Sequence, residues 1–574
     1  MKKLLLVILF LITVSSAFAS TDARFIERDS PLYAEMDALY ALSCLASPNT
    51  NRPWTESQAR LYLSKIDYDS LSDAGKELYK SIEIEIEKGL RWEFDDGFSL
   101  SGGITFSNEI YAHTDSEFDR EEEWVRSWTD REPLIRLWGE VSSGSMFYTA
   151  ADILYRYGRA AMEDNYGLLK DIMTTDGYIG SYDLSDPEKT PYIISSKYFS
   201  EKLATNFFTN TQNFSFIWPR RAVFSFGGER WNVSFSRDRM KLGKSHIGSL
   251  LVDDHSDYTD SIRTTFFNKY FTYDWILLPL NTLTSHSEDP VAESRVYMIH
   301  TLDFRILDKV SLKISENVMW KYSNFDLGYL NPSFFYHNLN NRSMFNALAY
   351  IEVNASLFKG FTLYGQYAMD QARAPHEGDS QSDAWGMSVG GEYTFSLGKS
   401  VFTAYSEYLL TSPLLYRRDG VDFIKVSRYY HQGSDNDTYG HIPFFEYIGY
   451  RYGGDTSTLK TGVTYIYPSM AEAEFSVQLM EHGGMNIYKS HNKEGKNEGN
   501  ANIGGSTPTG DDVLRAIIIS LKGEVDFSSI LAWPGISLYG EADWIGLASF
   551  NKENKEYKDY MSDFQLSLGV SLAI

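Results

Sequence analysis

The sequence has a single cysteine, no long apolar run beyond its first residues, and too few basic residues to balance its acidic ones. Cys44 has no second cysteine with which to form an intramolecular disulfide, so other interactions must hold the fold together. No later stretch stays apolar for the roughly 18 residues that a transmembrane helix requires. The chain carries 53 Lys and Arg against 77 Asp and Glu, a formal net charge of −24. Nucleic acid is not an expected partner, because phosphate binding needs a basic surface.

Motifs of catalysis and metal binding are missing as well. The histidines show no H-x-x-x-H spacing, and the sequence has no G-x-S-x-G elbow, no P-loop and no dinucleotide-binding fingerprint. With 77 carboxylates, neighbouring acidic residues are too common to single out a glycosidase pair. We therefore predict a non-enzymatic protein with no catalytic residue, no bound metal and no cofactor.

The last eleven residues are the most informative stretch that is present. Apolar and small or polar side chains alternate strictly there, and the apolar ones are Phe564, Leu566, Leu568, Val570, Leu572 and Ile574. In a strand this alternation gives one apolar face and one polar face. Strands of outer-membrane barrels have this pattern, with apolar side chains toward lipid and polar ones toward the lumen. We therefore expect the last strand to pair with the first one and to close a barrel.

The same period of two recurs along the chain from Gly97 onward. It is clearest in residues 98–110, 147–157, 231–236, 310–314, 385–395, 459–467, 517–527 and 536–544. Its persistence over about 480 residues predicts an all-β transmembrane barrel of about 18 antiparallel strands. Aromatic residues make up 15% of the chain, which fits aromatic girdles at the two membrane interfaces but also a soluble carbohydrate-binding β-protein.

Several connections between these segments are long and polar, and we expect them on the outer side of the barrel. They are residues 114–131, 165–189, 376–383 and 486–512, of which the last is expected to be the longest.

The chain begins with the pattern of a secretory signal peptide. Lys2 and Lys3 precede an apolar run over residues 4–14, and Ala17-Phe18-Ala19 is a small-x-small cleavage site. We therefore assign residues 1–19 to a signal peptide, residues 20–92 to a periplasmic helical domain, and residues 93–574 to the outer-membrane barrel.

Three helices are expected in the helical domain. Pro31 suits the first helical position, and Thr55-x-x-Gln58 is a capping box that opens a second helix. The third helix is predicted from about Ser72 to Lys88. Ile and Glu alternate over residues 82–87 and would allow a strand, but the residues before them are strong helix formers.

Several short segments occur in an order and spacing that one known family shares. They are Pro219-Arg220-Arg221, Arg237-Asp238-Arg239 at a strand end, Gly248 to Asp254, Arg295-Val296-Tyr297, Ile314 to Val318, Tyr329 to Pro332, and Leu363 to Asp370. The chain resembles the capsule assembly protein family, the Wzi-type outer-membrane barrels. It departs from the family pattern at Ser236, Leu242 and Gln371, where Gly, Trp and Asp are usual. The resemblance implies a barrel with a periplasmic helical bundle that attaches or organises a polysaccharide capsule, without a catalytic role.

The family-like segments also supply the candidate site residues. We predict a polysaccharide-binding or lumenal network of Arg220, Arg221, Arg237, Asp238, Arg239, Asp253, Asp254 and Asn331. Two interpretations stay open: a structural ladder of ion pairs at the barrel rim or in the lumen, and a lumenal lock or sugar contact. The adjacent carboxylates of Asp253 and Asp254 fall short of a full oxygen cage for a cation.

The favoured function is attachment or organisation of polysaccharide at the bacterial surface by a multi-pass β-barrel of the outer membrane. Expected partners are capsular or extracellular polysaccharide, outer-membrane lipid and, during biogenesis, the barrel-assembly machinery. The alternative is a porin-like diffusion channel for small solutes, whose acidic lumen would favour cations. A third possibility is a secreted, soluble polysaccharide-active enzyme, against which the terminal strand argues.

Overall fold

The computed structural model describes most of the chain from Thr21 to Ile574. Within that range it leaves out residues 89–91, 95–96, 116–117, 119–129, 157–204, 208–217, 281–293, 323–327, 329–330, 332–343, 372–382, 418–420, 433–438, 486, 488–505 and 529–534. The predicted signal peptide and the predicted connection over 165–189 therefore lie outside the described residues, as do most residues of the predicted connections over 114–131, 376–383 and 486–512.

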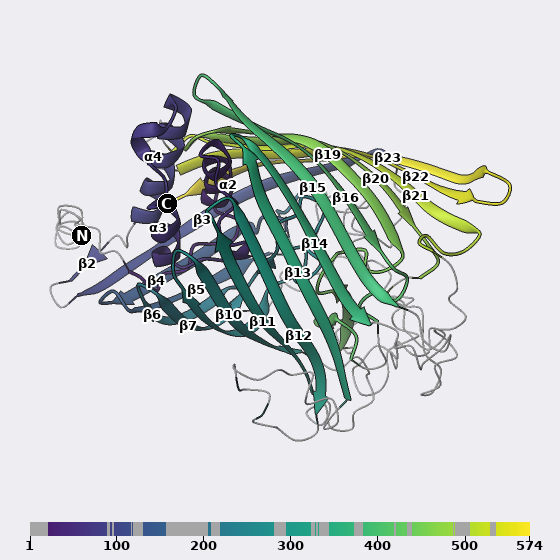
Figure 1. Cartoon of the computed structure of the whole chain (residues 1–574), viewed down its shortest axis with the longest axis horizontal. Helices are drawn as coiled ribbons and strands as arrows, with labels where there is room; N and C mark the ends of the chain where they lie inside the picture. The colour runs from purple at the N-terminus through teal and green to yellow at the C-terminus, as the bar shows by residue number, and fades with distance from the viewer. Residues whose placement is uncertain are drawn as a thin grey trace.

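Eighteen long antiparallel strands form a closed barrel in which each strand pairs with the next along the chain (Figure 1). In order they are β3 (Phe98–His113), β4 (Ile135–Ser143), β5 (Phe147–Tyr155), β6 (Ala222–Gly228), β7 (Trp231–Asp238), β9 (Thr259–Phe267), β10 (Phe271–Leu280), β11 (Ser294–Ile306), β12 (Val310–Tyr322), β13 (Met344–Phe358), β14 (Phe361–Gln371), β15 (Ala384–Leu397), β16 (Ser400–Thr411), β19 (Thr456–Tyr467), β20 (Ala471–His482), β21 (Asp512–Asp526), β22 (Gly535–Asn551) and β23 (Glu556–Ala573).

The last strand closes the barrel on the first, as predicted. β23 pairs with β3 so that Leu568 stands opposite Ile110. Ile574, the final residue, still exchanges backbone hydrogen bonds with Ile104. The short strand β2 (Trp92–Glu93) extends the sheet at the start of β3.

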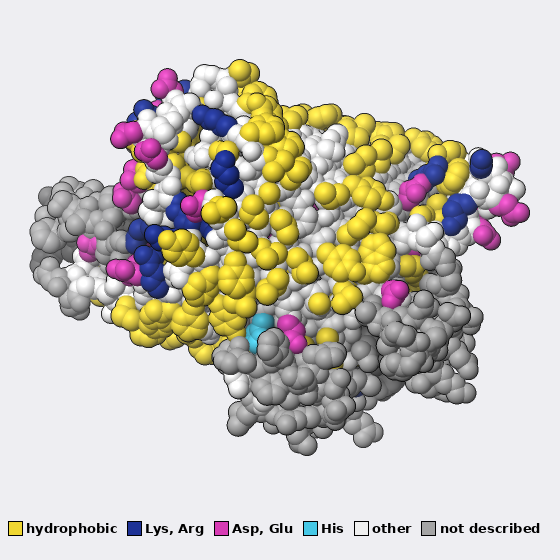
Figure 2. All heavy atoms as spheres, in the orientation of Figure 1, with side chains coloured by type: hydrophobic (Ala, Val, Ile, Leu, Met, Phe, Trp, Pro, Cys, Tyr) yellow, Lys and Arg dark blue, Asp and Glu magenta, His cyan; other side chains and the backbone are white. Residues whose placement is uncertain are grey.

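Apolar side chains form a belt across the outer face of the barrel seen in Figure 2, and exposed apolar residues recur on strands from β3 to β23. The predicted lipid face of β23 is exposed, with Phe564, Leu568 and Val570 each more than two fifths accessible. On the same strand Ser567 faces inward and is buried. The alternation of the sequence therefore decides which side chains meet lipid and which meet the lumen.

Short turns gather at one end of the barrel, and aromatic side chains ring that end. Phe358 stacks on Phe361, and Phe395 stacks on Phe402. Phe224 of β6 meets Phe147 of β5 edge to face, on strands that lie across the barrel from β13 to β16. This is the aromatic girdle expected at a membrane interface, and short turns mark the periplasmic end.

The helical segments pack at the same periplasmic end (Figure 1). They are α2 (Leu32–Leu42), α3 (Glu56–Leu63), the 3-10 turn η1 (Tyr68–Ser70) and α4 (Asp73–Glu87). The capping box of Thr55 and Gln58 is present, and Ser72 caps α4, so the helix predicted over residues 72–88 is confirmed. Their apolar core includes Val401 and Ile466 of the barrel wall, which joins the helices to the turns. No helix in the described part of the chain is long and apolar enough to cross a membrane.

Most connections at the opposite end are long, although residues 552–555 alone join β22 to β23 there. The connection between β5 and β6 covers residues 156–221, so the prediction that residues 486–512 form the longest one is wrong. Two connections carry their own strands inward. The one after β7 contains β8 (Lys241–Leu242), and the one after β16 contains the hairpin of β17 (Ile424–Gln432) and β18 (Tyr439–Tyr447). Phe118, in the connection between β3 and β4, is also buried, against Met480 and Ile518.

Candidate functional site: the filled lumen

The barrel lumen is occupied by segments that enter from both ends. The N-terminal region, which is the part of the chain before β2, enters from the periplasmic side. Its short strand β1 (Asn51–Arg52) pairs with β8 of the connection after β7. Leu250, Leu251 and Tyr416, all buried, contribute to one apolar core together with side chains of the wall strands. The lumen is therefore built as a protein interior rather than left as an open tube.

Residues of the N-terminal region hold polar positions on the inner wall. Asn51 Nδ2 donates to Asp274 Oδ2 of β10 and to Thr301 Oγ1 of β11, both at 2.8 Å. Thr50 Oγ1 donates to Glu352 Oε1 of β13 at 2.7 Å. Because all of these groups are buried, each hydrogen bond satisfies donors and acceptors that water does not reach. The N-terminal region is thus fixed across β10 to β13.

The connection after β7 continues this contact surface to the far wall. Lys244 Nζ lies 2.6 Å from Glu392 Oε1 of β15. Ser245 Oγ donates to Glu407 Oε1 of β16 at 2.6 Å, and the backbone N–H of His246 donates to the other carboxylate oxygen at 2.7 Å. Counted around the barrel from β3, β7 is the fifth strand and β16 the thirteenth of eighteen, so the two lie nearly opposite. The connection therefore crosses the lumen.

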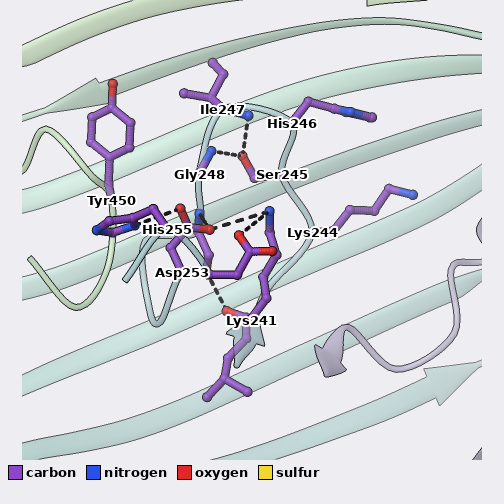
Figure 3. A network of polar contacts seen from close by, with 12 residues as sticks. Lys241, Lys244, Ser245, His246, Ile247, Gly248, Asp253, His255 and Tyr450 are labelled. Carbon is purple, nitrogen blue, oxygen red and sulfur yellow. Dashed lines mark hydrogen bonds and ion pairs between the residues drawn. The ribbon is translucent and has the colours of Figure 1, made fainter. Parts of the chain in front are cut away.

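A tight turn aims these side chains (Figure 3). Ser245 Oγ accepts the N–H groups of Ile247 at 3.0 Å and Gly248 at 2.8 Å. Lys244 and His246 extend away from Asp253 in this view. The ring of His246 stacks on Tyr405 of β16 with centroids 3.7 Å apart. Gly248 has a φ of +159°, close to extended backbone, and a Cβ there would lie 3.0 Å from the ring of Tyr450.

The second inward connection locks onto the first. Arg295 of β11 donates to the backbone oxygens of Asp422 at 2.8 Å and Ile424 at 2.7 Å. Tyr416 Oη donates to the backbone oxygen of Leu250 at 2.7 Å. Hydrogen bonds therefore hold the two inward connections to each other and to β11.

Five of the predicted site residues are buried, and ion pairs join most of the set. Arg221 Nε lies 3.0 Å from Asp238 Oδ2, and its Nη1 lies 3.3 Å from Glu27 Oε1. Arg239 reaches Asp130 at 3.0 Å and Asp29 at 3.5 Å. The buried five are Arg220, Arg221, Asp238, Arg239 and Asp253. This part of the network links the N-terminal region, β7 and the connection between β3 and β4.

The remaining predicted residues have different surroundings. Arg220 pairs with Asp257 at 2.5 Å, beside the same network. Arg237 pairs with Asp260 at 2.8 Å, but both side chains are about a third to a half exposed. Asn331 is exposed in the connection between β12 and β13, and its N–H donates to the oxygen of Gly328 at 3.4 Å.

Asp253 and Asp254 have cationic partners from the chain itself. Lys241 Nζ lies 3.5 Å from Asp253 and 3.6 Å from Asp254, and Arg28 pairs with Asp254. Burial alone would raise the pKa of both carboxyls, but Lys241 beside Asp253, and Arg28 and Lys241 beside Asp254, hold each pKa below its ordinary value. Among the described residues no cluster of three or more His, Cys, Asp or Glu is placed to hold a metal ion.

Glu27 is a central partner that the sequence did not reveal. It accepts from Arg136 at 2.7 Å and 3.1 Å and pairs with Arg221. Burial raises the pKa of Glu27, but the two guanidinium groups outweigh it and lower the pKa to about 2. The N-terminal region therefore enters the lumen with an ionised carboxylate.

Tyrosines that lie over glycines of the neighbouring strand also shape the inner wall. A Cβ at Gly390 of β15 would stand 2.4 Å from the ring of Tyr364, which is buried and donates to Glu407 at 3.0 Å. A Cβ at Gly462 of β19 would stand 2.6 Å from the hydroxyl of Tyr405. Only glycine leaves room for these rings, which bring their hydroxyls to the carboxylates of the wall.

One side of the inner wall is more accessible. Lys522 and Glu524 of β21 are exposed although they stand on the strand's polar, inward-facing row. Lys522 lies 3.0 Å from Glu474 of β20, and Glu474 is also 3.3 Å from Lys460. The filling of the lumen is therefore uneven, and water has access beside β20 and β21.

No family model matches the sequence, and no curated protein matches it. Among solved structures the chain is similar to Wzi of Escherichia coli, described as an outer-membrane protein involved in group 1 capsule assembly and a carbohydrate-binding β-barrel. The TM-score is 0.54 at 12% identity, over 95% of this chain and 98% of that one. The chain has the fold of Wzi. It is also similar to OprD of Pseudomonas aeruginosa, with a TM-score of 0.39 at 8% identity, over 84% of this chain and 96% of that one. For OmpT of Vibrio cholerae the TM-score is 0.33 at 8% identity, over 84% and 99%.

The predicted fold class and location are confirmed. A closed antiparallel barrel of eighteen strands with an apolar outer belt is the architecture of outer-membrane proteins, and the chain is placed in the outer membrane.

Proposed function

We propose that this barrel attaches or organises capsular or extracellular polysaccharide at the bacterial surface, and that its role is non-enzymatic. Support comes from the fold that it shares with Wzi over nearly the whole of both chains, because Wzi is described as a carbohydrate-binding barrel of capsule assembly. The family-like segments of the sequence support membership of the Wzi-type family.

The observation that carries the proposal is the connection after β7, which crosses the lumen. It is fixed on the far wall by Lys244, Ser245 and His246, through one ion pair and two hydrogen bonds. A channel needs a continuous path for water, whereas an anchor needs a rigid body that displays its outer loops. The described contacts favour the anchor.

The proposed function assigns a role to each part of the chain. Residues 20–92 would form the periplasmic unit after removal of a signal peptide over residues 1–19, and residues 93–574 the barrel, inserted into lipid by the barrel-assembly machinery. We assign the seven predicted residues other than Asn331 to a structural role. In this role the network fixes the inward connection, and the sugar contacts lie elsewhere.

A diffusion channel is the second candidate. The exposure of Lys522 and Glu524 on the inner wall favours it, because such groups would line a water-filled path beside the filled part of the lumen.

Two measurements on the full-length chain separate these functions. A strain that lacks the gene is expected to shed surface polysaccharide into the medium, and the wild-type gene is expected to restore retention. Purified barrel in planar bilayers is expected to show no stable conductance. Unchanged polysaccharide retention together with stable conductance would replace the anchor by the channel.

A further inference from the structure

The sheet formed by β21, β22 and β23 extends beyond the apolar belt at the end opposite the helices (Figures 1 and 2). On β21 the lipid-facing row runs from Leu521 through Ile519 to Ile517, and the next residue on that face is Arg515. On β20 the same row passes from Leu479 to Glu481. The change from apolar to charged residues marks the edge of the apolar belt at the end opposite the helices.

Above this edge the outer face carries aromatic rings. The registers place Val513 opposite Phe550, and Phe550 opposite Tyr557, so that all three share the face of Arg515 and Ile517. At about 3.4 Å per residue, Val513 lies roughly 14 Å along the strand beyond Ile517. The rings of Phe550 and Tyr557 therefore stand clear of the hydrocarbon.

Arg515 holds these rings in one arrangement. Its guanidinium lies 3.5 Å from the ring centre of Phe550, donates to Tyr557 Oη at 2.5 Å and pairs with Glu481 at 2.7 Å. The two rings are 5.0 Å apart. Tyr557 is nevertheless 62% exposed. A flat ring that is fixed from behind and open in front needs little reorganisation to bind a ligand.

The charge of this region differs from that of the chain. Residues 551–560 contain Lys552, Lys555 and Lys558 against Glu553, Glu556 and Asp559, a balance of zero. The chain as a whole carries −24. The tip of the β22–β23 hairpin, residues 551–560, therefore does not add to the repulsion that an acidic polymer would meet from the rest of the acidic chain.

From this arrangement we infer that Arg515, Phe550 and Tyr557 form a glycan-binding ledge for the surface polysaccharide. The rings stack on the apolar C–H faces of sugar units, and Arg515, Glu481 and the lysines of the tip meet hydroxyl and carboxylate groups. The inference rests on the proposed function and assigns its contact surface to the outer face of β21 to β23, away from the lumenal network.

The test compares full-length wild-type barrel with three variants for binding to immobilised polysaccharide extracted from the source strain. Tyr557→Ala is expected to weaken binding about tenfold, because stacking is lost. Tyr557→Phe keeps the ring and is expected to bind within about twofold of wild type. The matched control is Tyr270→Ala in a periplasmic turn, where Tyr270 is 59% exposed and Lys269 lies 4.9 Å from its ring centre; it is expected to change nothing.

The outcomes separate the ledge from the proposed function. Wild-type binding that survives Tyr557→Ala unchanged overturns the ledge and leaves the function standing, whereas a wild type that binds no polysaccharide overturns the function itself. Equal loss in Tyr557→Phe and Tyr557→Ala overturns stacking as the contact. The same variants are also tested for binding to purified lipopolysaccharide. If Tyr557→Ala loses binding to lipopolysaccharide but keeps binding to the polysaccharide, the ligand is a lipid headgroup and the inference is overturned. Heat-modifiable migration on gels confirms that each variant is folded.

Discussion

Replacing Lys244 by methionine is expected to release the connection that crosses the lumen. Lys244 Nζ lies 2.6 Å from Glu392 and 3.0 Å from Ser47 Oγ, and the side chains of Lys244 and Glu392 are only 8% and 6% exposed. Methionine keeps most of the volume but removes the charge. Glu392 is then left buried with His246 Nε2, at 3.3 Å, as its nearest basic group.

The size of the effect follows from burial. Removing one partner of a buried ion pair costs about 3–5 kcal/mol, because the other charge stays out of water. The remaining contact with His246 places the expected loss near the lower end. At 1.4 kcal/mol per factor of ten, the population of the released connection rises about a hundredfold.

Two assays measure this release. Planar-bilayer recordings are expected to show channel openings for Lys244→Met that the wild type lacks, and the temperature at which the barrel loses its compact gel migration is expected to fall. Lys399→Met is the matched control, because Lys399 and Glu77 form an exposed pair at 3.4 Å, worth about 0–1 kcal/mol. The double variant Lys244→Met, Glu392→Leu is expected to recover most of the loss, since an apolar pair often replaces a buried ion pair without penalty. Indistinguishable recordings and melting for Lys244→Met and Lys399→Met would refute the reasoning.

Three further predictions concern other parts of the chain. Arg221→Met is expected to lower the melting temperature clearly, whereas Arg237→Met, which removes a partly exposed pair, costs about 0–1 kcal/mol; equal losses by differential scanning calorimetry would contradict this. Burial raises the pKa of Glu35 to about 7 from 4.5. Between these two pH values the folded chain keeps a proton that the unfolded chain loses. The free energy of unfolding therefore falls by on the order of 3 kcal/mol as the pH rises from about 4.5 to 7. Glu35→Gln is expected to flatten that slope in thermal unfolding curves, and an unchanged slope would exclude Glu35 as its source. Gly390→Ala is expected to lower the free energy of unfolding by about 1–3 kcal/mol, because the new Cβ clashes with the ring of Tyr364. Gly139→Ala is expected to lower it less, because its Cβ meets only an ordinary contact at 3.8 Å. The reverse order in urea unfolding would show that the tyrosine ring moves aside.

The barrel could be predicted because its signal is local. Alternation along residues 564–574 fixes which side chains meet lipid, and a final strand of this kind needs a partner, which is β3. The capping box at Thr55 is equally local, because its hydrogen bonds join residues three apart. Such features depend on neighbours in the sequence and need no knowledge of the distant chain.

The filled lumen could not be predicted in the same way. Glu352, Glu392 and Glu407 stand at inward positions of their strands, where the sequence pattern indicates only that they face the lumen. Their partners, such as Thr50 and Lys244, lie more than a hundred residues away. A wall carboxylate that faces water and one that anchors a crossing segment are identical in sequence, so only the three-dimensional arrangement distinguishes them. Glu27 was missed for the same reason.

The position of Asn51 makes the barrel wall and the segments inside it depend on each other. Asn51 is buried and donates to polar groups of β10 and β11. Without the N-terminal region these wall groups would lose a hydrogen bond, and without the wall Asn51 would lose both of its own. Wall and contents therefore share one set of buried polar groups, so damage to either is expected to weaken the other.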